Sequence, residues 1–165
     1  MDAHGRTEAA VLVPLVGWPQ EPNLIFTVRR MDLRRHPGEI SFPGGRRDRD
    51  ESLLGTALRE SEEEIGLKPA SVEVVGALPP IGTFVTSYKV NPFVGLVADR
   101  VELTPNPAEV AEVLRFGLDE LREGFAMRRL VRRGVPIRTP TYEVGEHMIW
   151  GATARILGEL LDRLR

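Results

Sequence analysis

The sequence predicts an α+β fold built around a mixed β-sheet, and two observations carry this prediction. Short runs rich in β-branched residues are mixed with a few amphipathic stretches, without the regular strand–helix alternation of a doubly wound fold. The chain has 165 residues, of which 42% are hydrophobic and 28% charged, so it can bury a core and is not disordered. At this length we expect one domain over residues 1–165.

The first part of the chain is expected to hold two strands, a loop and a helix. The strands are expected at 10–13 and 24–28, which are short and rich in β-branched residues. The next segment, 29–50, is polar and contains several glycines and prolines, which favours mostly loop. A helix is expected over 52–65, because Gly66 stands where a left-handed C-terminal cap belongs.

The rest of the chain is expected to add two strands and shorter helices. The strands are expected at 72–78 and 90–97, linked by a long loop. A short helix is expected over 107–114, followed by a further turn at 118–122. A final helix is indicated by apolar residues at spacings of three and four, namely Trp150, Ala154, Leu157, Leu161 and Leu164.

Charge and composition exclude several classes of protein. The 22 Lys and Arg residues face 24 Asp and Glu residues, a net charge of −2, whereas nucleic-acid binders held by phosphate contacts show a basic excess. The absence of Cys excludes disulfides, thiolate metal sites and cysteine nucleophiles. We find no signal peptide and no stretch long enough to span a bilayer, so we expect a cytoplasmic protein with neither nucleic acid nor membrane as a partner.

The expected helix over 52–65 carries a cluster of acids. Glu60, Glu63 and Glu64 fall on one side of it at spacings of three and four, where like charges repel by roughly 0.2–0.5 kcal/mol per pair. One interpretation is a solvated face, on which Arg59 offsets part of the repulsion. The other is a hard divalent cation such as Mg²⁺, which takes carboxylate oxygens, substrate phosphates and waters as ligands.

The context of this cluster favours the second interpretation. The run from 45 to 67 resembles the Nudix box, with every fixed position matched: Gly45, Glu51, Arg59, Glu60, Glu63, Glu64, Gly66 and Leu67. Ser61 departs from the aliphatic residue usual in that family, but it lies on the apolar face of the helix and away from the acids. The resemblance implies a Nudix-type α/β/α sandwich around a mixed β-sheet.

The resemblance also implies a reaction and residue roles. Nudix enzymes use Mg²⁺ or Mn²⁺ to hydrolyse a nucleoside diphosphate linked to another group. By position, Glu60, Glu63, Glu64 and the carbonyl of Gly45 would be metal ligands, and Glu63 and Glu64 would be catalytic. Arg59 would pair with Glu51 in a structural role. Gly66, as the helix cap, would also be structural. The general base stays open between Glu64 and an acid from a distant loop, namely Glu109, Glu112, Glu143 or Glu146.

A longer stretch before the box is similar to the coenzyme A pyrophosphatase branch of this family. The matching residues are Arg29, Leu33, Arg34, His36, Gly38, Glu39, Phe42, Pro43, Gly44 and Gly45. Segments 87–95 and 149–154 also resemble that branch. The likeness implies hydrolysis of coenzyme A or acyl-coenzyme A to 3′,5′-ADP and (acyl-)4′-phosphopantetheine. We expect substrate binding by Arg29, Arg34, His36 and Glu39, since arginine forks suit phosphates. The alternatives are a solvated loop for the arginines, a turn cap for His36, and loop anchoring or a metal contact for Glu39.

Two alternatives stay open. One is the same chemistry on ADP-ribose, NADH or a dinucleoside polyphosphate; the other is a non-catalytic ligand-sensing domain, against which the complete acidic cluster argues. We expect a small-molecule partner and a possible homodimer. Tyr88, Phe93 and Trp150 are expected in the core, and the basic residues of 128–138 either form a solvated face or meet a substrate phosphate.

Overall fold

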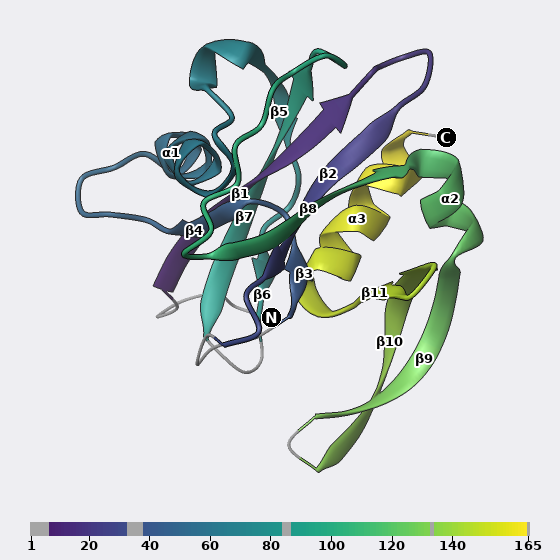
Figure 1. Cartoon of the computed structure of the whole chain (residues 1–165). Helices are drawn as coiled ribbons and strands as arrows, with labels where there is room; N and C mark the ends of the chain where they lie inside the picture. The colour runs from purple at the N-terminus through teal and green to yellow at the C-terminus, as the bar shows by residue number, and fades with distance from the viewer. Residues whose placement is uncertain (1–6, 33–37, 84–86, 133, 165) are drawn as a thin grey trace.

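The computed structural model describes residues 7–32, 38–83, 87–132 and 134–164 (Figure 1). The elements in chain order are β1 (Thr7–Val16), β2 (Asn23–Arg29), β3 (Ile40–Ser41), β4 (Gly44–Arg46), α1 (Leu53–Ile65), a 3-10 helix (Pro69–Ser71), β5 (Val72–Ala77), β6 (Ile81–Gly82), β7 (Tyr88–Val97), β8 (Val110–Gly117), α2 (Leu118–Glu123), β9 (Phe125–Arg132), β10 (Val135–Val144), β11 (His147–Ile149) and α3 (Gly151–Arg163).

A mixed sheet forms the centre of the molecule. Its main order is β3-β2-β1-β7-β5, with β4 also paired to β1, β6 to β7 and β8 to β2. Strands β1 and β7 are parallel along their whole length, and the other pairs are antiparallel. Helix α1 covers one face of this sheet and α3 the other (Figure 1). The α+β sandwich expected from the sequence is therefore confirmed.

The alternation of side chains along β1 explains the two layers. Ala10 and Leu12 join a buried cluster with Ala57 of α1, whereas Val13 and Leu15 join the cluster that contains the apolar residues of α3. Successive side chains of a strand point to opposite faces, so a strand that is apolar on both faces needs cover on both. The amphipathic helices α1 and α3 supply this cover.

Helix α1 begins and ends as its sequence predicts. Ser52 accepts a hydrogen bond from the backbone N–H of Gly55 at 2.9 Å, and Gly66 adopts the left-handed conformation with φ of 70°. Ser61 is fully buried, and its hydroxyl donates to the carbonyl of Ala57 at 2.7 Å. The unusual serine of the motif therefore satisfies its hydroxyl within the helix.

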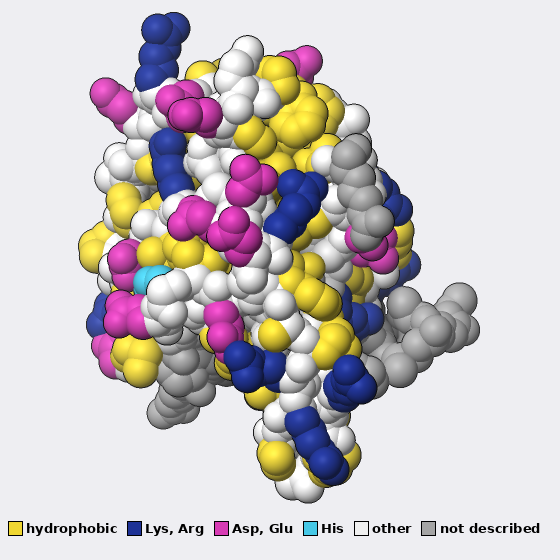
Figure 2. Space-filling model, turned by 90° about the vertical axis from the view of Figure 1, so that its right-hand side faces the viewer, with side chains coloured by type: hydrophobic (Ala, Val, Ile, Leu, Met, Phe, Trp, Pro, Cys, Tyr) yellow, Lys and Arg dark blue, Asp and Glu magenta, His cyan; other side chains and the backbone are white. Residues whose placement is uncertain are grey.

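Beyond the sheet, β9, β10 and β11 form a second, antiparallel sheet. Its long β9–β10 hairpin projects from the body as an arm (Figure 1). The arm exposes apolar and basic side chains (Figure 2), including Val131 at 68% and Val135 at 57% exposure. Arg128 pairs with Glu143 across the arm at 2.7 Å, and Arg129 stands opposite Arg138. These exposed arginines agree with the solvated-face interpretation of 128–138.

Two expectations about secondary structure are corrected. The helix expected over 107–114 is wrong, because Val110–Gly117 is strand β8, which pairs with the buried strand β2. Its Leu114 and Phe116 enter the cluster under α3, so packing against β2 overrides the local helical pattern. The described part of 29–50 is mostly loop, as expected, and also contains the short strands β3 and β4. The turn at 118–122 is the short helix α2. Within the described residues, no helix is long and apolar enough to cross a membrane.

Candidate active site

One guanidinium group connects the acids of α1 to the loop before it. Arg59 Nε donates to Glu51 Oε2 at 2.7 Å, and Nη2 donates to Glu51 Oε1 at 3.1 Å and to the carbonyl of Arg46 at 3.2 Å. Its Nη1 donates to Glu60 Oε1 at 2.9 Å and to Glu63 Oε2 at 3.2 Å. The Arg59–Glu51 pair that the motif resemblance implies is therefore present, and Arg59 also holds two of the clustered acids.

The same network fixes the charge of Glu51. Hydrogen bonds from Arg59, and then from the hydroxyl of Thr56 at 2.7 Å, lower the pKa of Glu51 to about 2. The fixed Glu51 carboxylate accepts a further bond from the backbone N–H of Asp48 at 3.1 Å. Glu51 thus joins the loop to the first turns of α1.

A pair of glycines brings backbone against the acids. Strand β4 pairs with β1, which places Gly45 beside Ala10 in register. The N–H of Gly44 donates to Glu64 Oε2 at 3.3 Å. A Cβ atom at Gly45 would lie 2.7 Å from Glu60 Cδ and 2.9 Å from each of its carboxylate oxygens, so only glycine leaves room for this carboxylate.

Two of the acids are difficult to ionise in this position. Burial, followed by the negative charge of Glu60, raises the pKa of Glu64 to about 8. Burial also raises the pKa of Glu60, which Arg59 opposes. The charge of Glu109 raises the pKa of both carboxyls, so this acid lies within electrostatic reach of them.

The other distant acids lie elsewhere. Glu112 is exposed on β8, Glu143 pairs with Arg128 on the arm, and Glu146 is exposed in the turn between β10 and β11. Of the distant acids expected as alternatives to Glu64 for the general base, Glu109 is therefore the one coupled to the α1 cluster.

The donor set suits a hard divalent cation, although the acids are not yet gathered around one point. Among the described residues, no three His, Asp or Glu side chains are arranged to hold a metal ion. The carboxylates of Glu60 and Glu63 instead accept hydrogen bonds from the guanidinium of Arg59. The oxygens are of the kind that Mg²⁺ and Mn²⁺ bind, and a cation would relieve the cost of ionising buried carboxylates. The missing Cβ at Gly45 leaves space beside Glu60. These residues fit such an ion.

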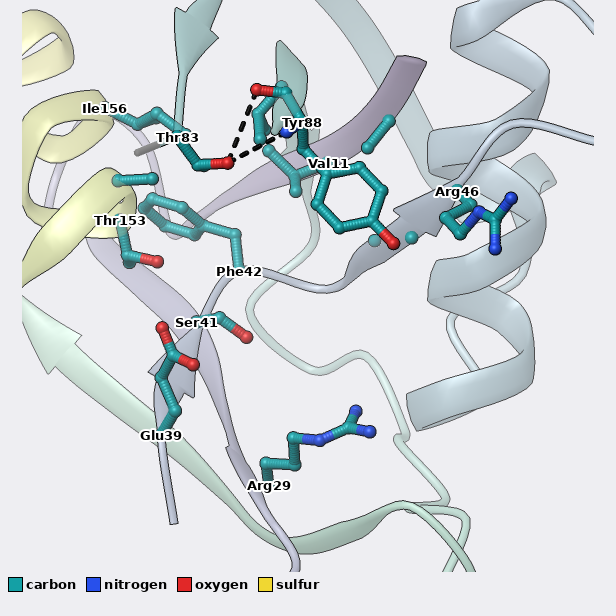
Figure 3. A pocket seen from close by; sticks show the side chains of 15 residues that line it. Val11, Arg29, Glu39, Ser41, Phe42, Arg46, Thr83, Tyr88, Thr153 and Ile156 are labelled. Carbon is teal, nitrogen blue, oxygen red and sulfur yellow. Dashed lines mark hydrogen bonds between the residues drawn. The ribbon is translucent and has the colours of Figure 1, made fainter. Parts of the chain in front are cut away.

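A pocket of about 310 Å³ opens beside the two glycines (Figure 3). Residues far apart in sequence line it: Arg29, Glu39, Phe42, Gly44, Gly45, Arg46, Tyr88, Val90, Ala152, Thr153 and Ile156. They come from β2, β4, β7, α3 and the segment around β3. In Figure 3 the guanidinium groups of Arg29 and Arg46 lie away from Thr153 on α3. The pocket therefore has a basic side with Arg29 and Arg46, and a separate side under α3 toward which the carboxylate of Glu39 points (Figure 3).

Two of the four residues expected to bind substrate line this pocket. These are Arg29 and Glu39, whereas Arg34 and His36 lie outside the described residues. Tyr88 was expected in the core but is half-buried, because it lies at the start of β7, where it lines the pocket wall. Thr153 was not identified from the sequence as a site residue, although it lies in the segment 149–154 that resembles the coenzyme A branch.

Comparisons with known proteins agree on the family. The family model described as "NUDIX domain" matches residues 6–134. "Uncharacterized Nudix hydrolase NudL" of Pectobacterium atrosepticum is 39% identical over 163 residues, which cover 95% of this chain and 82% of the relative. The protein of the same name from Escherichia coli O7:K1 is 40% identical over 156 residues, covering 93% of this chain and 80% of the relative.

Solved structures share the fold at lower identity. A MutT/nudix family protein from Enterococcus faecalis has a TM-score of 0.68 at 15% identity, covering 99% of this chain and 64% of that protein. The NUDIX domain of Shewanella oneidensis NrtR, solved with ADP ribose, has a TM-score of 0.61 at 15% identity, covering 97% and 89%. With the acids of α1, the glycine pair and the sandwich in place, these matches show that the chain belongs to the Nudix hydrolases, which act on phosphorus-containing anhydrides.

Proposed function

We propose that this enzyme hydrolyses the diphosphate bond of coenzyme A or acyl-coenzyme A. The supporting observation is that three stretches that resemble the coenzyme A branch meet in one pocket, although they are far apart in sequence. They are represented there by Arg29 and Glu39, by Tyr88, and by Ala152 and Thr153. A common substrate for the three is the simplest reason for such a convergence.

A divalent ion, Mg²⁺ or Mn²⁺, is proposed to bind Glu60, Glu63, Glu64 and the carbonyl of Gly45. Such an ion supplies charge neutralisation at the diphosphate oxygens and a lower pKa for an attacking water. Before they can bind it, Glu60 and Glu63 must release Arg59 Nη1, while the bonds of Arg59 to Glu51 can remain. Arg59 would thus offset the charges of Glu60 and Glu63 until the ion arrives.

The residues of the chain then have separate tasks. Arg29 and Arg46 supply positive charge to the phosphates from the pocket wall, and Arg34 and His36 are proposed to assist them. Glu64 or Glu109 accepts the proton of the water whose oxygen forms the new bond to phosphorus. The bridging P–O bond breaks, which releases 3′,5′-ADP and (acyl-)4′-phosphopantetheine.

The second candidate is the same chemistry on ADP-ribose, NADH or a dinucleoside polyphosphate. It is favoured by the fold neighbours, which include the NUDIX domain solved with ADP ribose and an Ap4A hydrolase of C. elegans with a TM-score of 0.58 at 15% identity. Their identity is too low to carry a substrate to this chain.

A substrate panel tests both candidates. The protein is incubated with Mg²⁺ and coenzyme A, acetyl-coenzyme A, ADP-ribose, NADH or diadenosine tetraphosphate, in water enriched in heavy oxygen, and the products are identified by mass spectrometry. We expect the highest kcat/KM for coenzyme A or its thioester, with the label in one of the two products. Higher kcat/KM for ADP-ribose would reject the proposal.

Matched variants separate catalysis from mere ligand sensing. Glu64→Gln is expected to lower kcat by at least about 100-fold, since it removes a metal ligand or base. The exposed Glu62 lies outside the cluster, so Glu62→Gln is the control and should retain activity. If the wild type bound coenzyme A without turning over any substrate of the panel, a sensing domain would replace the enzyme proposal.

A further inference from the structure

The N-terminal end of α3 opens into the pocket without a cap. The helix has 13 residues, and the preceding Trp150 provides no capping hydrogen bond from its side chain. The first N–H groups of a helix have no partner within the helix and point along its axis. In the part of the chain that the structure describes, the N–H groups of Ala152 and Thr153 have no hydrogen-bond partner. Both residues line the pocket, so a bound molecule can approach these donors.

The side chain of Thr153 is an independent sign of a ligand. Thr153 is only 7% exposed, yet its hydroxyl makes no hydrogen bond to any described residue. Figure 3 shows this hydroxyl pointing into the pocket. The oxygen of this hydroxyl is not among the buried atoms without a partner, so it opens onto the pocket, where a bound molecule can supply an acceptor.

The other groups at this end decide what kind of acceptor fits. Glu39 lies across the pocket from Thr153, with its carboxylate directed toward the end that α3 closes (Figure 3). The rest of this end is lined by Phe42 and Ile156, with the hydroxyl of Ser41 beside Glu39 (Figure 3). A phosphate here would lie near the carboxylate of Glu39, which disfavours it, whereas Arg29 and Arg46 offer phosphates a better place elsewhere in the pocket.

A secondary amide satisfies both sides of this end. Its carbonyl oxygen can accept from Thr153 and the first N–H groups of α3, and its N–H can donate to Glu39. The carbon chain on either side of the amide would lie against Phe42 and Ile156. Pantetheine, the non-nucleotide arm of coenzyme A, is an aliphatic chain with secondary amides.

We propose that the end of the pocket under α3 binds an amide of the substrate's non-nucleotide arm, with Thr153 as the residue that selects for it. This inference rests on the proposed function, since it concerns the same pocket and the same substrate class. It adds a means of discrimination, because ADP-ribose has no amide for Thr153 and Glu39 to recognise. The metal-binding acids play no part in it.

A titration without metal or turnover tests the binding directly. Isotope-labelled protein is titrated with 4′-phosphopantetheine, and the backbone N–H signals are followed by NMR. We expect the signals of Ala152 and Thr153 to shift, while that of Gly134, in the turn of the β9–β10 arm, stays in place. The loss of one neutral hydrogen bond should weaken binding about fivefold in Thr153→Val, while Thr153→Ser, which keeps the hydroxyl, should bind within about twofold of the wild type. Unmoved Ala152 and Thr153 signals would overturn the proposal.

Kinetics then identify which part of the substrate is recognised. In Thr153→Val, the ratio of kcat/KM for coenzyme A to that for ADP-ribose should fall about fivefold. The ratio of kcat/KM for dephospho-coenzyme A to that for ADP-ribose should fall equally. A loss confined to coenzyme A would assign Thr153 to the 3′-phosphate and refute the amide. Equal losses on all three substrates would show a general structural defect and refute it too. If the wild type fails to hydrolyse coenzyme A, the proposed function fails, while the titration still decides whether α3 binds an amide.

Discussion

Replacing Gly45 by Ala tests the contact between backbone and acid on which the proposed metal site depends. The new Cβ would lie 2.7 Å from Glu60 Cδ, whereas ordinary contact begins at 3.4 Å, so the carboxylate must move by about 0.7 Å. Because Glu60 is a flexible side chain, we expect a stability cost of only about 1 kcal/mol. Active-site groups must be held within about 0.5 Å, and a displacement of about 1 Å can cost 100-fold in rate, so kcat/KM should fall by about 10- to 100-fold.

The assay measures three quantities on the same protein: Mn²⁺ affinity by calorimetry, kcat/KM with the best substrate of the panel, and unfolding by urea. Gly44→Ala is the control, because its Cβ would meet backbone, at 2.3 Å from the carbonyl oxygen of Ala10 and 2.7 Å from Val11 Cα. It should lose about 2–3 kcal/mol of stability, since backbone cannot move aside as a side chain does. A Gly45→Ala protein with wild-type Mn²⁺ affinity and activity would refute the assignment of Glu60 as a ligand.

Three further predictions concern pH and packing. Arg59 lowers the pKa of Glu51 from 4.5 to about 2, so the stabilisation is present above pH 4.5 and is lost as pH falls toward 2. In urea unfolding, the difference in unfolding free energy between wild type and Glu51→Gln should therefore shrink between about pH 6 and about pH 3. A difference that stays constant would contradict the pairing. Burial raises the pKa of Glu64 from 4.5 to about 8, so its neutral form carries no penalty below pH 4.5, and stability is lost as pH rises toward 8. With a chelator present, the unfolding free energy of Glu64→Gln should exceed that of wild type by on the order of 2 kcal/mol near pH 8 and by little near pH 4. A difference independent of pH would count against this burial. A Cβ at Gly124 would lie 2.0 Å from the carbonyl oxygen of Glu143, so Gly124→Ala should lower the melting temperature by about 5–10 °C in calorimetry, and an unchanged value would show that the arm can shift away.

Much of the candidate site could be predicted because it is local. Glu60, Glu63 and Glu64 lie on one helix, which is capped by the flanking residues Ser52 and Gly66. The partner of Arg59 within the motif, Glu51, stands eight positions before it and is bonded as the resemblance implied. Spacing along one helix determines which side chains are neighbours, so these relations need no knowledge of the rest of the fold.

Which segments pair with one another as strands could not be predicted from the sequence. The segment Val110–Gly117 forms a strand rather than a helix because it pairs with β2. The arm forms because β9 and β10 pair with each other across a turn. The energy of a strand comes from its cross-strand neighbours and burial, which a local pattern does not contain.

From the sequence alone came the family, the acidic helix and the α+β sandwich, all of which depend on residues at fixed, short separations. Only the tertiary structure placed Glu109 beside the acids and brought Arg29, Tyr88 and Thr153 to one pocket. It also showed that Arg59 holds Glu60 and Glu63 as well as Glu51. Contacts between distant segments follow from how layers of sheet and helix pack together, and that packing is a property of the whole chain at once.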